Sequence, residues 1–446
     1  MSTTATNINR TPLERWIAER LAVLVPALTR EVIAQYQLRA LQNTVAWARQ
    51  HSLYYSHLFE ALPDDLPQSL EEISRLPFTT SEDIALHGSE FLCVSQSDIS
   101  RVVTMDSSGT NGAPKRMFFT TADQELALNF FACGVAPIAA PGDRMLIALP
   151  GEREGSVGYQ LSKGIARAGV IPIPHGLSID PAATLQRMEQ ENATSIIGLP
   201  VQMLALALHQ SALSASVMRR LRSIVLCSDH VPESIVRRLR QECGCEVFQH
   251  YGTTEMGLGG GVDCQAHMGY HLREADLYFE IVSPTTGEPL PDGEMGEVVF
   301  TTLHRTGMPL IRYRTGDLSR FLTGPCACGS IVRRLEKIRS RVDGLVSLGT
   351  YGSTSIAELD ETLFDLPGLQ DFRVAVMQTT PRKMTVTLYA PGAGDAFRAM
   401  VFDALEALPV IGQNCSSGEL QLSVILSHTP FPVTAAKRKI EVCSSL

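Results

Sequence analysis

The stretch Asp106-Ser-Ser-Gly-Thr-Asn-Gly-Ala-Pro-Lys115 decides how the rest of the chain is interpreted. Its glycines let backbone N–H groups approach an anion closely. The serine and threonine hydroxyls add hydrogen-bond donors, and Lys115 adds a mobile positive charge. This composition is typical of a loop that holds phosphate.

The segments on either side, Ile99–Met105 and Arg116–Thr121, are apolar enough to form strands, so the loop is predicted to join two strands. It is not a Walker loop, because that pattern places Gly-Lys-Ser/Thr at the start of a helix. Here Ala113 and Pro114 separate the last glycine from the lysine. An ordinary Ser/Gly/Pro turn is the alternative for this stretch taken alone.

The composition is that of an ordinary globular protein with two or three domains, since 44% of the 446 residues are apolar and 19% are charged. A formal net charge of −9 without a dense Lys/Arg block argues against nucleic acid or an anionic membrane as the main partner. The N-terminus lacks the apolar core of a signal peptide, and no apolar run is long enough to span a bilayer. We therefore expect a cytoplasmic protein.

Hydrophobic spacing predicts an α/β protein with a large N-terminal domain and a small α+β C-terminal domain after a hinge. Residues 1–75 are predicted to be mainly helical, with Pro26 dividing a long helical stretch. Between residues 145 and 248, strand-like segments alternate with helical ones, which indicates parallel sheets covered by helices. Residues 278–330 have the short strands and turns of a small β-barrel-like part. The predicted domains are residues 1–342 and 343–446.

Three motifs follow one another along the chain: residues 106–115, Tyr251-Gly-Thr-Thr-Glu255 and Tyr313-Arg-Thr-Gly-Asp317. Together they resemble the adenylate-forming acyl-CoA synthetase superfamily, and most closely its phenylacetate-CoA ligase branch. The likeness runs from about Tyr36 to the C-terminus. Further similar segments are Leu76-Pro-Phe-Thr-Thr80, Gly287-Glu-Pro-Leu-Pro-Asp-Gly293, Met308-Pro-Leu-Ile-Arg-Tyr313 and Pro325-Cys-Ala-Cys-Gly329.

The resemblance implies that ATP activates a small carboxylic acid, of the aryl or arylacetic type, as an acyl-AMP with release of pyrophosphate. Coenzyme A then captures the acyl group. Mg²⁺ is the implied metal, because the reaction brings two anions together. Two alternatives stay open: an adenylate-forming enzyme that passes the acyl or AMP group to an acceptor other than CoA, and an adenylate-binding protein without catalysis. A homodimer is possible by analogy with the family.

The resemblance also assigns roles to residues. Thr254 matches the family position that contacts the α-phosphate, and Glu255 matches the position that binds Mg²⁺. Tyr251 is expected to stack on adenine, Asp317 to accept hydrogen bonds from the ribose hydroxyls, and Arg341 to assist at the ribose. The remaining residues expected to bind ATP or AMP are Ser107, Ser108, Gly109, Thr110, Gly112, Lys115, Ser228, Asp229, His230, His250, Gly252 and Thr253.

The chain departs from the family pattern at two places. The turn Ser228-Asp-His230 stands where the family often has Gly-Ala-Glu. Near the C-terminus, Arg438 falls on the arginine of a Gly-Lys-Ala-x-Arg pattern, which puts Ala435 where the adenylation lysine is expected. Lys437, our candidate for the catalytic lysine, or Lys439 would substitute if the segment shifts. Neighbouring side chains on a strand face opposite sides, so side chains in this segment cannot be exchanged freely.

Ten cysteines without a secretion signal favour reduced thiols or a metal site over a disulfide framework. The pair Cys243 and Cys245 is interpreted as structural, and His267 is a rival metal ligand. Unrelated thiols and a surface histidine are the alternative to a metal site. Relatives in this branch hold a structural zinc ion with thiolates and one imidazole, at positions that match Cys264, His271, Cys326 and Cys328.

Overall fold

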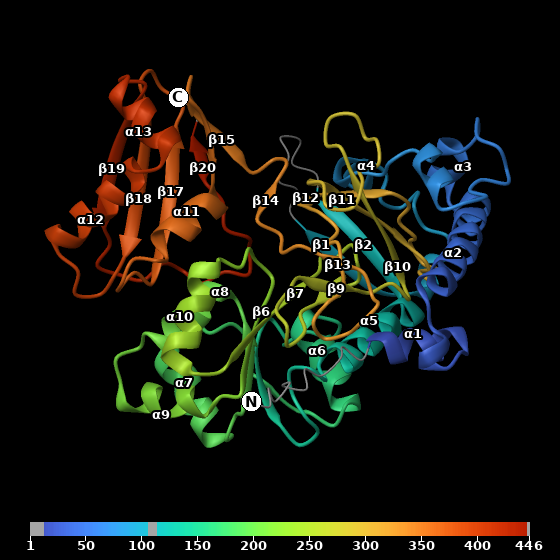
Figure 1. Cartoon of the computed structure of the whole chain (residues 1–446), viewed down its shortest axis with the longest axis horizontal. Coiled ribbons are helices and arrows are strands. Elements are labelled where there is room, and N and C mark those ends of the chain that lie inside the picture. Colours follow the sequence, from blue (N-terminus) through green and yellow to red (C-terminus); the bar gives the residue numbers. More distant parts are fainter. Residues whose placement is uncertain (1–12, 106–113, 444–446) are drawn as a thin grey trace, which may run out of the picture. The chain divides into compact units, whose positions relative to one another are not determined.

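The computed structural model describes residues 13–105 and 114–443 (Figure 1). The chain divides into two compact units. The first unit holds the described residues up to Gly142, together with Gly151–Pro172 and Phe248–Lys337. The second unit holds Asp143–Pro150, Ile173–Val247 and the chain from Ile338 onward. The predicted boundary between domains at residue 342 remains a prediction.

The first unit begins with helices, as predicted. Helix α1 (Leu13–Leu21) is separated from α2 (Arg30–His51) by the 3₁₀ helix η1 (Val25–Ala27), where Pro26 occupies the first turn. The Thr29 hydroxyl accepts the N–H of Val32 and so caps α2. The next elements are α3 (Leu53–Leu58), η2 (Glu71–Arg75), α4 (Ser81–His87) and η3 (Gln96–Asp98).

The predicted strands on either side of residues 106–113 are present as β1 (Ile99–Met105) and β2 (Lys115–Thr120), which pair antiparallel. Helix α5 (Thr121–Gly134) follows directly, and Asp123 closes a capping box with Thr120 at its start. The same Asp123 carboxylate accepts the N–H groups of Thr306 and Gly307. Helix α6 (Val157–Arg167) packs against α5.

Two antiparallel arrangements complete the first unit. The end of β7 (Glu246–Tyr251) pairs with β8 (Gly261–Val262), which pairs with β9 (Tyr270–Leu272) and so leads to β13 (Arg334–Leu335). In the predicted β-rich region, β10 (Leu277–Val282), β11 (Gly296–Thr302) and β12 (Tyr313–Ser319) form a second antiparallel set.

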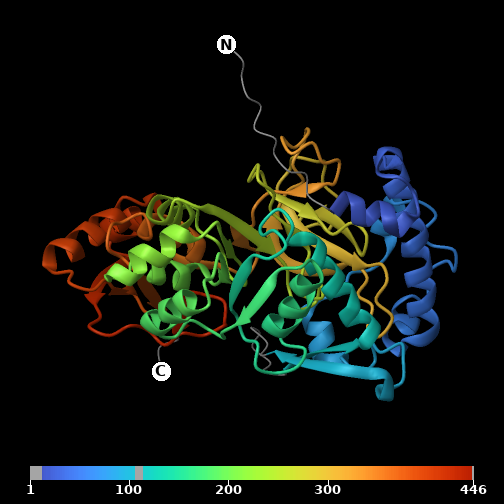
Figure 2. The ribbon, with the colours of Figure 1, turned by 90° about the horizontal axis from the view of Figure 1, so that it is seen from below.

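The second unit contains the predicted alternation of strands and helices. Strands β3 (Arg144–Ala148), β5 (Ser195–Gly198) and β6 (Ser223–Leu226) pair in parallel. Figure 2 shows helices α7 to α10 in green, gathered beside one another, and they cover the buried apolar residues of these strands. The bounds of β4 and these helices are β4 Ile171–Pro174, α7 Pro181–Gln190, α8 Pro200–Ala207, α9 Ala212–Arg220 and α10 Glu233–Cys243.

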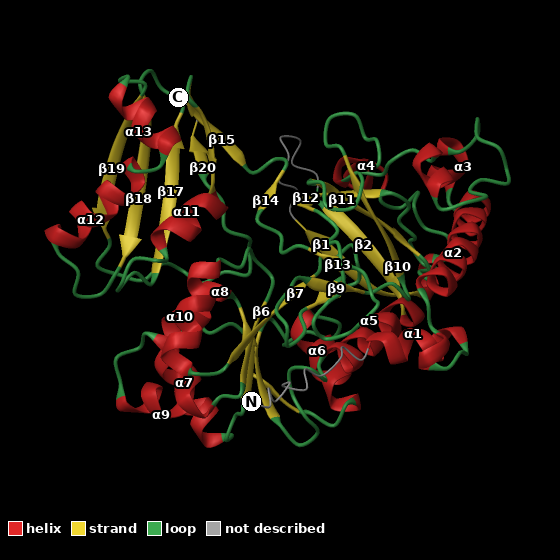
Figure 3. Cartoon of the chain, viewed as in Figure 1, coloured by secondary structure: helices red, strands yellow, loops and turns green. Residues whose placement is uncertain are grey.

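The C-terminal part of the second unit is α+β, as predicted (Figure 3). Its sheet has the order β19-β18-β17-β20, in which only the β17–β18 pair is antiparallel. No helix within the described ranges is both long and apolar enough to cross a membrane. The bounds are β14 Ser340–Arg341, β15 Leu345–Gly349, β16 Gly352–Ser355, α11 Ile356–Leu363, β17 Asp371–Met377, β18 Arg382–Tyr389, α12 Asp395–Glu406, α13 Pro409–Ser416, β19 Leu420–Leu426 and β20 Glu441–Cys443.

Candidate active site

A buried ion pair joins the first residue of β2 to the loop after β7. The Lys115 ammonium contacts the Glu255 carboxylate and lies 3.1 Å from Ser81 Oγ and 3.2 Å from the Tyr313 hydroxyl oxygen. The Tyr313 hydroxyl donates to Glu255 Oε1 at 3.2 Å. The structure therefore brings together two residues that the sequence assigned to the phosphates and to the metal.

The charge of Glu255 is set mainly by this pair. Burial acts to raise the pKa of Glu255, but the Lys115 ammonium outweighs it and lowers that pKa to about 2. The carboxylate is therefore ionised throughout the physiological pH range. If an anion binds the Lys115 ammonium in place of Glu255, the ionised Glu255 carboxylate can bind a cation such as Mg²⁺.

Tyr313 and Ser81 belong to this cluster although sequence reasoning gave them no role. Burial alternates along β12, so Tyr313, Thr315 and Asp317 share one face of the strand. Because Asp317 was already a candidate site residue, the two-residue period of the strand could have indicated that Tyr313 faces the same site. Ser81 is the first residue of α4, and nothing in the sequence near it pointed to Lys115.

The loop after β7 closes tightly because Gly252 has no side chain. A Cβ at Gly252 would lie 2.6 Å from the carbonyl oxygen of Leu258, which no side chain tolerates. The N–H of Leu258 donates to the Thr253 carbonyl at 2.9 Å and so closes the turn. Thr254 and Glu255 lie inside this turn, which holds both residues in place.

The residues predicted for adenine and ribose touch one another. The Tyr251 hydroxyl donates to Asp317 Oδ2 at 2.9 Å. Tyr251 also stacks on Tyr270, with 5.7 Å between ring centroids and an interplanar angle of 26°. Asp317 is only 2% exposed, so its carboxylate is held by the protein before any nucleotide binds.

His250 faces aromatic side chains of α5. Its ring centroid lies 5.9 Å from that of Phe130 and 6.1 Å from that of Phe131. A Cβ at Gly259 would lie 2.3 Å from the Phe130 ring, so the glycine leaves room for this contact. Burial lowers the pKa of His250 to about 4, which keeps the imidazole neutral. The three rings form a neutral aromatic cluster directly before Tyr251, in which both phenylalanines are buried.

In the second unit, the turn after β6 carries the other residues predicted to line the base. Ser228 has a φ of 72°, the left-handed conformation that glycine adopts without cost, and the family often has glycine there. The Asp229 carboxylate accepts the N–H of His230 at 2.8 Å and the N–H of Arg438 at 3.2 Å. Burial lowers the pKa of His230, whose Nδ1 lies 3.2 Å from the Ile338 carbonyl oxygen.

Lys437 and Lys439 lie in a segment without regular secondary structure, and both are exposed. The premise that they lie on a strand was wrong, since β20 begins only at Glu441. The reason is that the N–H of Arg438 donates to the Asp229 carboxylate instead of to a neighbouring strand.

Arg341 lies in β14 and forms an ion pair with Asp343 at 3.1 Å. The other predicted phosphate-binding residues belong to the stretch 106–113, so they lie outside the described residues. These are Ser107, Ser108, Gly109, Thr110 and Gly112.

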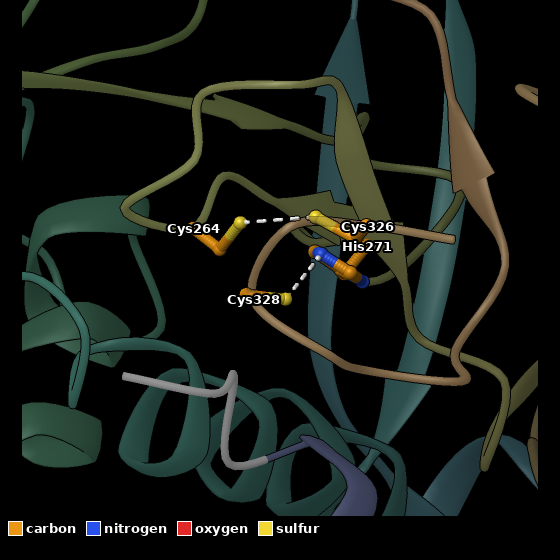
Figure 4. Close-up of side chains that lie close together, drawn as sticks. All are labelled: Cys264, His271, Cys326 and Cys328. Atoms are coloured by element: carbon orange, nitrogen blue, oxygen red, sulfur yellow. Dashed lines mark hydrogen bonds between the residues drawn. The ribbon is translucent and has the colours of Figure 1, made fainter. Parts of the chain in front are cut away.

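Four predicted metal ligands converge in the first unit (Figure 4). Their candidate ligand atoms all lie within 4.8 Å of one another, and all four residues are buried. Cys264 Sγ is 3.7 Å from Cys326 Sγ, and Cys328 Sγ is 3.5 Å from His271 Nε2. Three thiols and one imidazole at this spacing fit the donor set and size of a tetrahedral zinc site.

The rival ligand His267 is not part of this group. Its Nδ1 lies 2.9 Å from Asp263 Oδ2, and its ring packs 5.0 Å from that of Phe248. Within the cluster, a hydrogen bond from Cys264 lowers the pKa of Cys328 to about 3. A thiolate is the form of cysteine that binds metal.

Known proteins are similar to this chain over most of its length. Residues 78–304 match the AMP-binding enzyme family. The phenylacetate-coenzyme A ligase of Thermus thermophilus is 30% identical over 327 residues, 72% of each chain, and that of Pseudomonas putida is 30% identical over 341 residues, 73% of this chain and 74% of the relative. A solved 2-hydroxyisobutyryl-CoA ligase in its postadenylation state shares the fold, with a TM-score of 0.77 at 20% identity over 92% of this chain and 89% of that one.

The chain therefore belongs to the AMP-binding enzyme family. Within that family it is an AMP-forming acid–CoA ligase of the phenylacetate-CoA ligase-like branch. Its activity is acyl-CoA ligation through an acyl-AMP, with ATP, coenzyme A and a small-molecule acid as substrates. The predictions of fold class, family and enzyme class are confirmed.

The first testable consequence is a pH-dependent difference between the wild type and Glu255→Gln. The folded pKa of Glu255, about 2, lies below the ordinary value of 4.5, so its contribution to stability is complete above pH 4.5 and is lost as the pH falls toward 2. We expect the wild type to lose about 2 kcal/mol relative to Glu255→Gln between pH 5 and pH 3.

Urea unfolding of both proteins at several pH values between 5 and 3 measures this difference. Tyr313→Phe is the matched control, because it removes a hydroxyl from the same cluster and leaves the ion pair in place. A wild-type advantage over Glu255→Gln that stays constant across the range would contradict the assignment.

Proposed function

We propose that the acid activated by this enzyme is of the aryl or arylacetic type. The observation that carries the proposal is the neutral aromatic cluster of His250, Phe130 and Phe131 beside the segment that leads into Tyr251. An aromatic ring packs favourably against such side chains. The printed names of the relatives, phenylacetate-coenzyme A ligases, support the same class of acid.

We propose that the Lys115–Glu255 pair opens when ATP binds. Lys115 is then available to the β- and γ-phosphates together with Ser107, Ser108 and Thr110. Glu255 would hold Mg²⁺, and Thr254 would contact the α-phosphate. Bound Mg²⁺ supplies positive charge that lets the acid carboxylate approach the phosphate. The fit of this carboxylate to a cation rests on its burial and its low pKa.

The Tyr251–Asp317 contact supports a role for both residues at the adenosine. Tyr251 presents a ring fixed by Tyr270 for stacking on the base. Asp317 uses Oδ2 for the Tyr251 hydroxyl, and a carboxylate has further acceptor capacity for ribose hydroxyls. Tyr251 thus orients the carboxylate that the sugar would meet.

The second prediction tests the substrate class and the nucleotide site. Pyrophosphate release is measured with ATP and a panel of benzoic, phenylacetic and aliphatic acids, with and without CoA. We expect turnover with aryl or arylacetic acids, and Asp317→Ala should raise the KM for ATP about 10- to 100-fold because charge-assisted hydrogen bonds are lost.

Tyr251→Phe is the control, since it removes the hydroxyl contact but keeps the Asp317 carboxylate and the ring. Preferential turnover of aliphatic acids would contradict the substrate class. An equal rise in KM for both variants would show that Asp317 acts on Tyr251 rather than on the ribose.

We propose Lys437 as the lysine that reaches the acid carboxylate and the α-phosphate. The third prediction compares Lys437→Ala with Lys439→Ala, because both lysines are exposed on the same segment and differ by two positions. Loss of a cation at the reacting phosphate should slow adenylation about 100-fold in Lys437→Ala, whereas Lys439→Ala should stay within about threefold of the wild type. The reverse pattern would assign the role to Lys439.

We also propose a structural zinc ion at Cys264, His271, Cys326 and Cys328. It would connect the loop between β8 and β9 to the segment before β13 and so stabilise the first unit.

The fourth prediction is about one zinc per chain by elemental analysis of the purified protein. We expect Cys328→Ser to lose the metal and lower the Tm, and a strong chelator to lower the Tm of the wild type but not that of the variant. Cys93→Ser, which changes a buried thiol outside the cluster, is the control. A metal-free wild type with an unchanged Tm in chelator would exclude the site.

A further inference from the structure

The side chain of Arg438 lies in a socket in the second unit that is formed by Phe364, Phe372, Asp360 and Asp371. Its guanidinium lies against two buried aromatic rings that contact one another, with its central carbon 5.0 Å from the Phe364 centroid and 4.5 Å from the Phe372 centroid. Nη2 donates to Asp360 Oδ1 at 3.0 Å, and Nη1 pairs with Asp371. The planar guanidinium of arginine can stack on aromatic rings and bind two carboxylates at once, whereas the ammonium of lysine cannot do both.

The main chain at the same residue is held separately. The N–H of Arg438 lies 3.4 Å from Asp229 Oδ1 and 3.2 Å from Asp229 Oδ2. Asp229 belongs to the turn after β6 that is proposed to line the base, and it also accepts the N–H of His230. One residue of the C-terminal segment is therefore fixed by its side chain to α11 and β17 and by its backbone to that turn.

The two exposed lysines lie on either side of this anchor. Arg438 turns inward, with 18% of its side chain exposed, whereas Lys437 and Lys439 are both exposed. Ile440, the next residue, is buried again. Fixing Arg438 at two points limits the positions that the neighbouring lysines can reach.

We propose that Arg438 is a positioning residue for adenylation: anchored to Asp229, Asp360 and Asp371, it holds the lysine-bearing segment in register with the turn Ser228–His230. The inference rests on the proposed function, because it gives the segment its task in the first half-reaction. Arg438 itself does not touch the reacting atoms. It acts by ordering Lys437, so its loss should affect adenylation and spare the later transfer to CoA.

The fifth prediction separates the two half-reactions. Pyrophosphate release reports adenylation, and conversion of supplied acyl-AMP to acyl-CoA reports the transfer. We expect Arg438→Met to slow adenylation at least tenfold and to leave the transfer within twofold of the wild type. Arg438→Lys should give nearly the same loss, because a single ammonium cannot span both carboxylates.

Arg373→Met is the matched control. Arg373 stacks on Phe431 of the same C-terminal segment, at 4.8 Å, but it is exposed and takes no part in the socket. Both half-reactions of this variant should stay within twofold. Equal losses in both half-reactions of Arg438→Met would overturn the proposal in favour of a merely structural role, and so would an unchanged rate of adenylation.

Two features reduce the risk that Arg438→Met fails to fold. Burial raises the pKa of Asp360 to about 7, so this carboxyl can take up a proton when its cation is removed. If Arg438→Met still fails to fold, the double variant Asp360→Asn/Arg438→Met removes the buried charge together with its partner and is expected to show the same selective loss.

Hydrogen exchange at the Arg438 amide tests the anchor without reference to activity. We expect exchange to accelerate at least tenfold in Asp229→Ala and to stay unchanged in Asp365→Ala, which removes an exposed carboxylate of the same unit. An unchanged rate in Asp229→Ala would refute the anchor. A wild type that adenylates no acid would instead refute the proposed function, and the exchange result would still decide the anchor.

Discussion

The buried ion pair between Lys115 and Glu255 is the constraint on which the first unit's site depends. Removing two charges from water costs several kcal/mol per ion, and only close geometry with further hydrogen bonds offsets that cost. Ser81 and Tyr313 provide those hydrogen bonds, so four separate segments meet at one point. A buried ion pair of this kind need not increase the stability of the fold. For a ligase, it keeps both side chains charged at a site proposed to bind a charged nucleotide.

The backbone around this pair restricts which residues can occupy the site. Gly252 permits a turn that no side chain would allow, and the period of strand β12 sends Tyr313 and Asp317 to the same side. The first reaches Glu255 and the second reaches Tyr251. One strand thus serves the parts of the site assigned to the phosphates and to the adenosine.

In the second unit, the turn Ser228–His230 fixes the backbone of the C-terminal segment. There a departure from the family pattern, Asp229 in place of a small residue, provides a carboxylate that holds the backbone of the C-terminal segment. Ser228 accepts a left-handed conformation at the same turn. Two of the three residues that made this turn look unlike the family, Ser228 and Asp229, therefore have structural explanations.

The motifs, the helix divided at Pro26, the strands beside residues 106–113 and the candidate metal ligands, with His271 and His267 as rivals, were evident in the sequence by itself. They depend on local chemistry: backbone restrictions of proline and glycine, the periodicity of side chains, and the donor types of cysteine and histidine. The contact of Tyr313 with Glu255, the selection of His271 over His267, and the irregular course of Lys437 to Lys439 were decided only by the tertiary structure. Each depends on which distant groups become neighbours, and burial determines that choice because a charge or N–H removed from water must find its partner wherever the fold provides one.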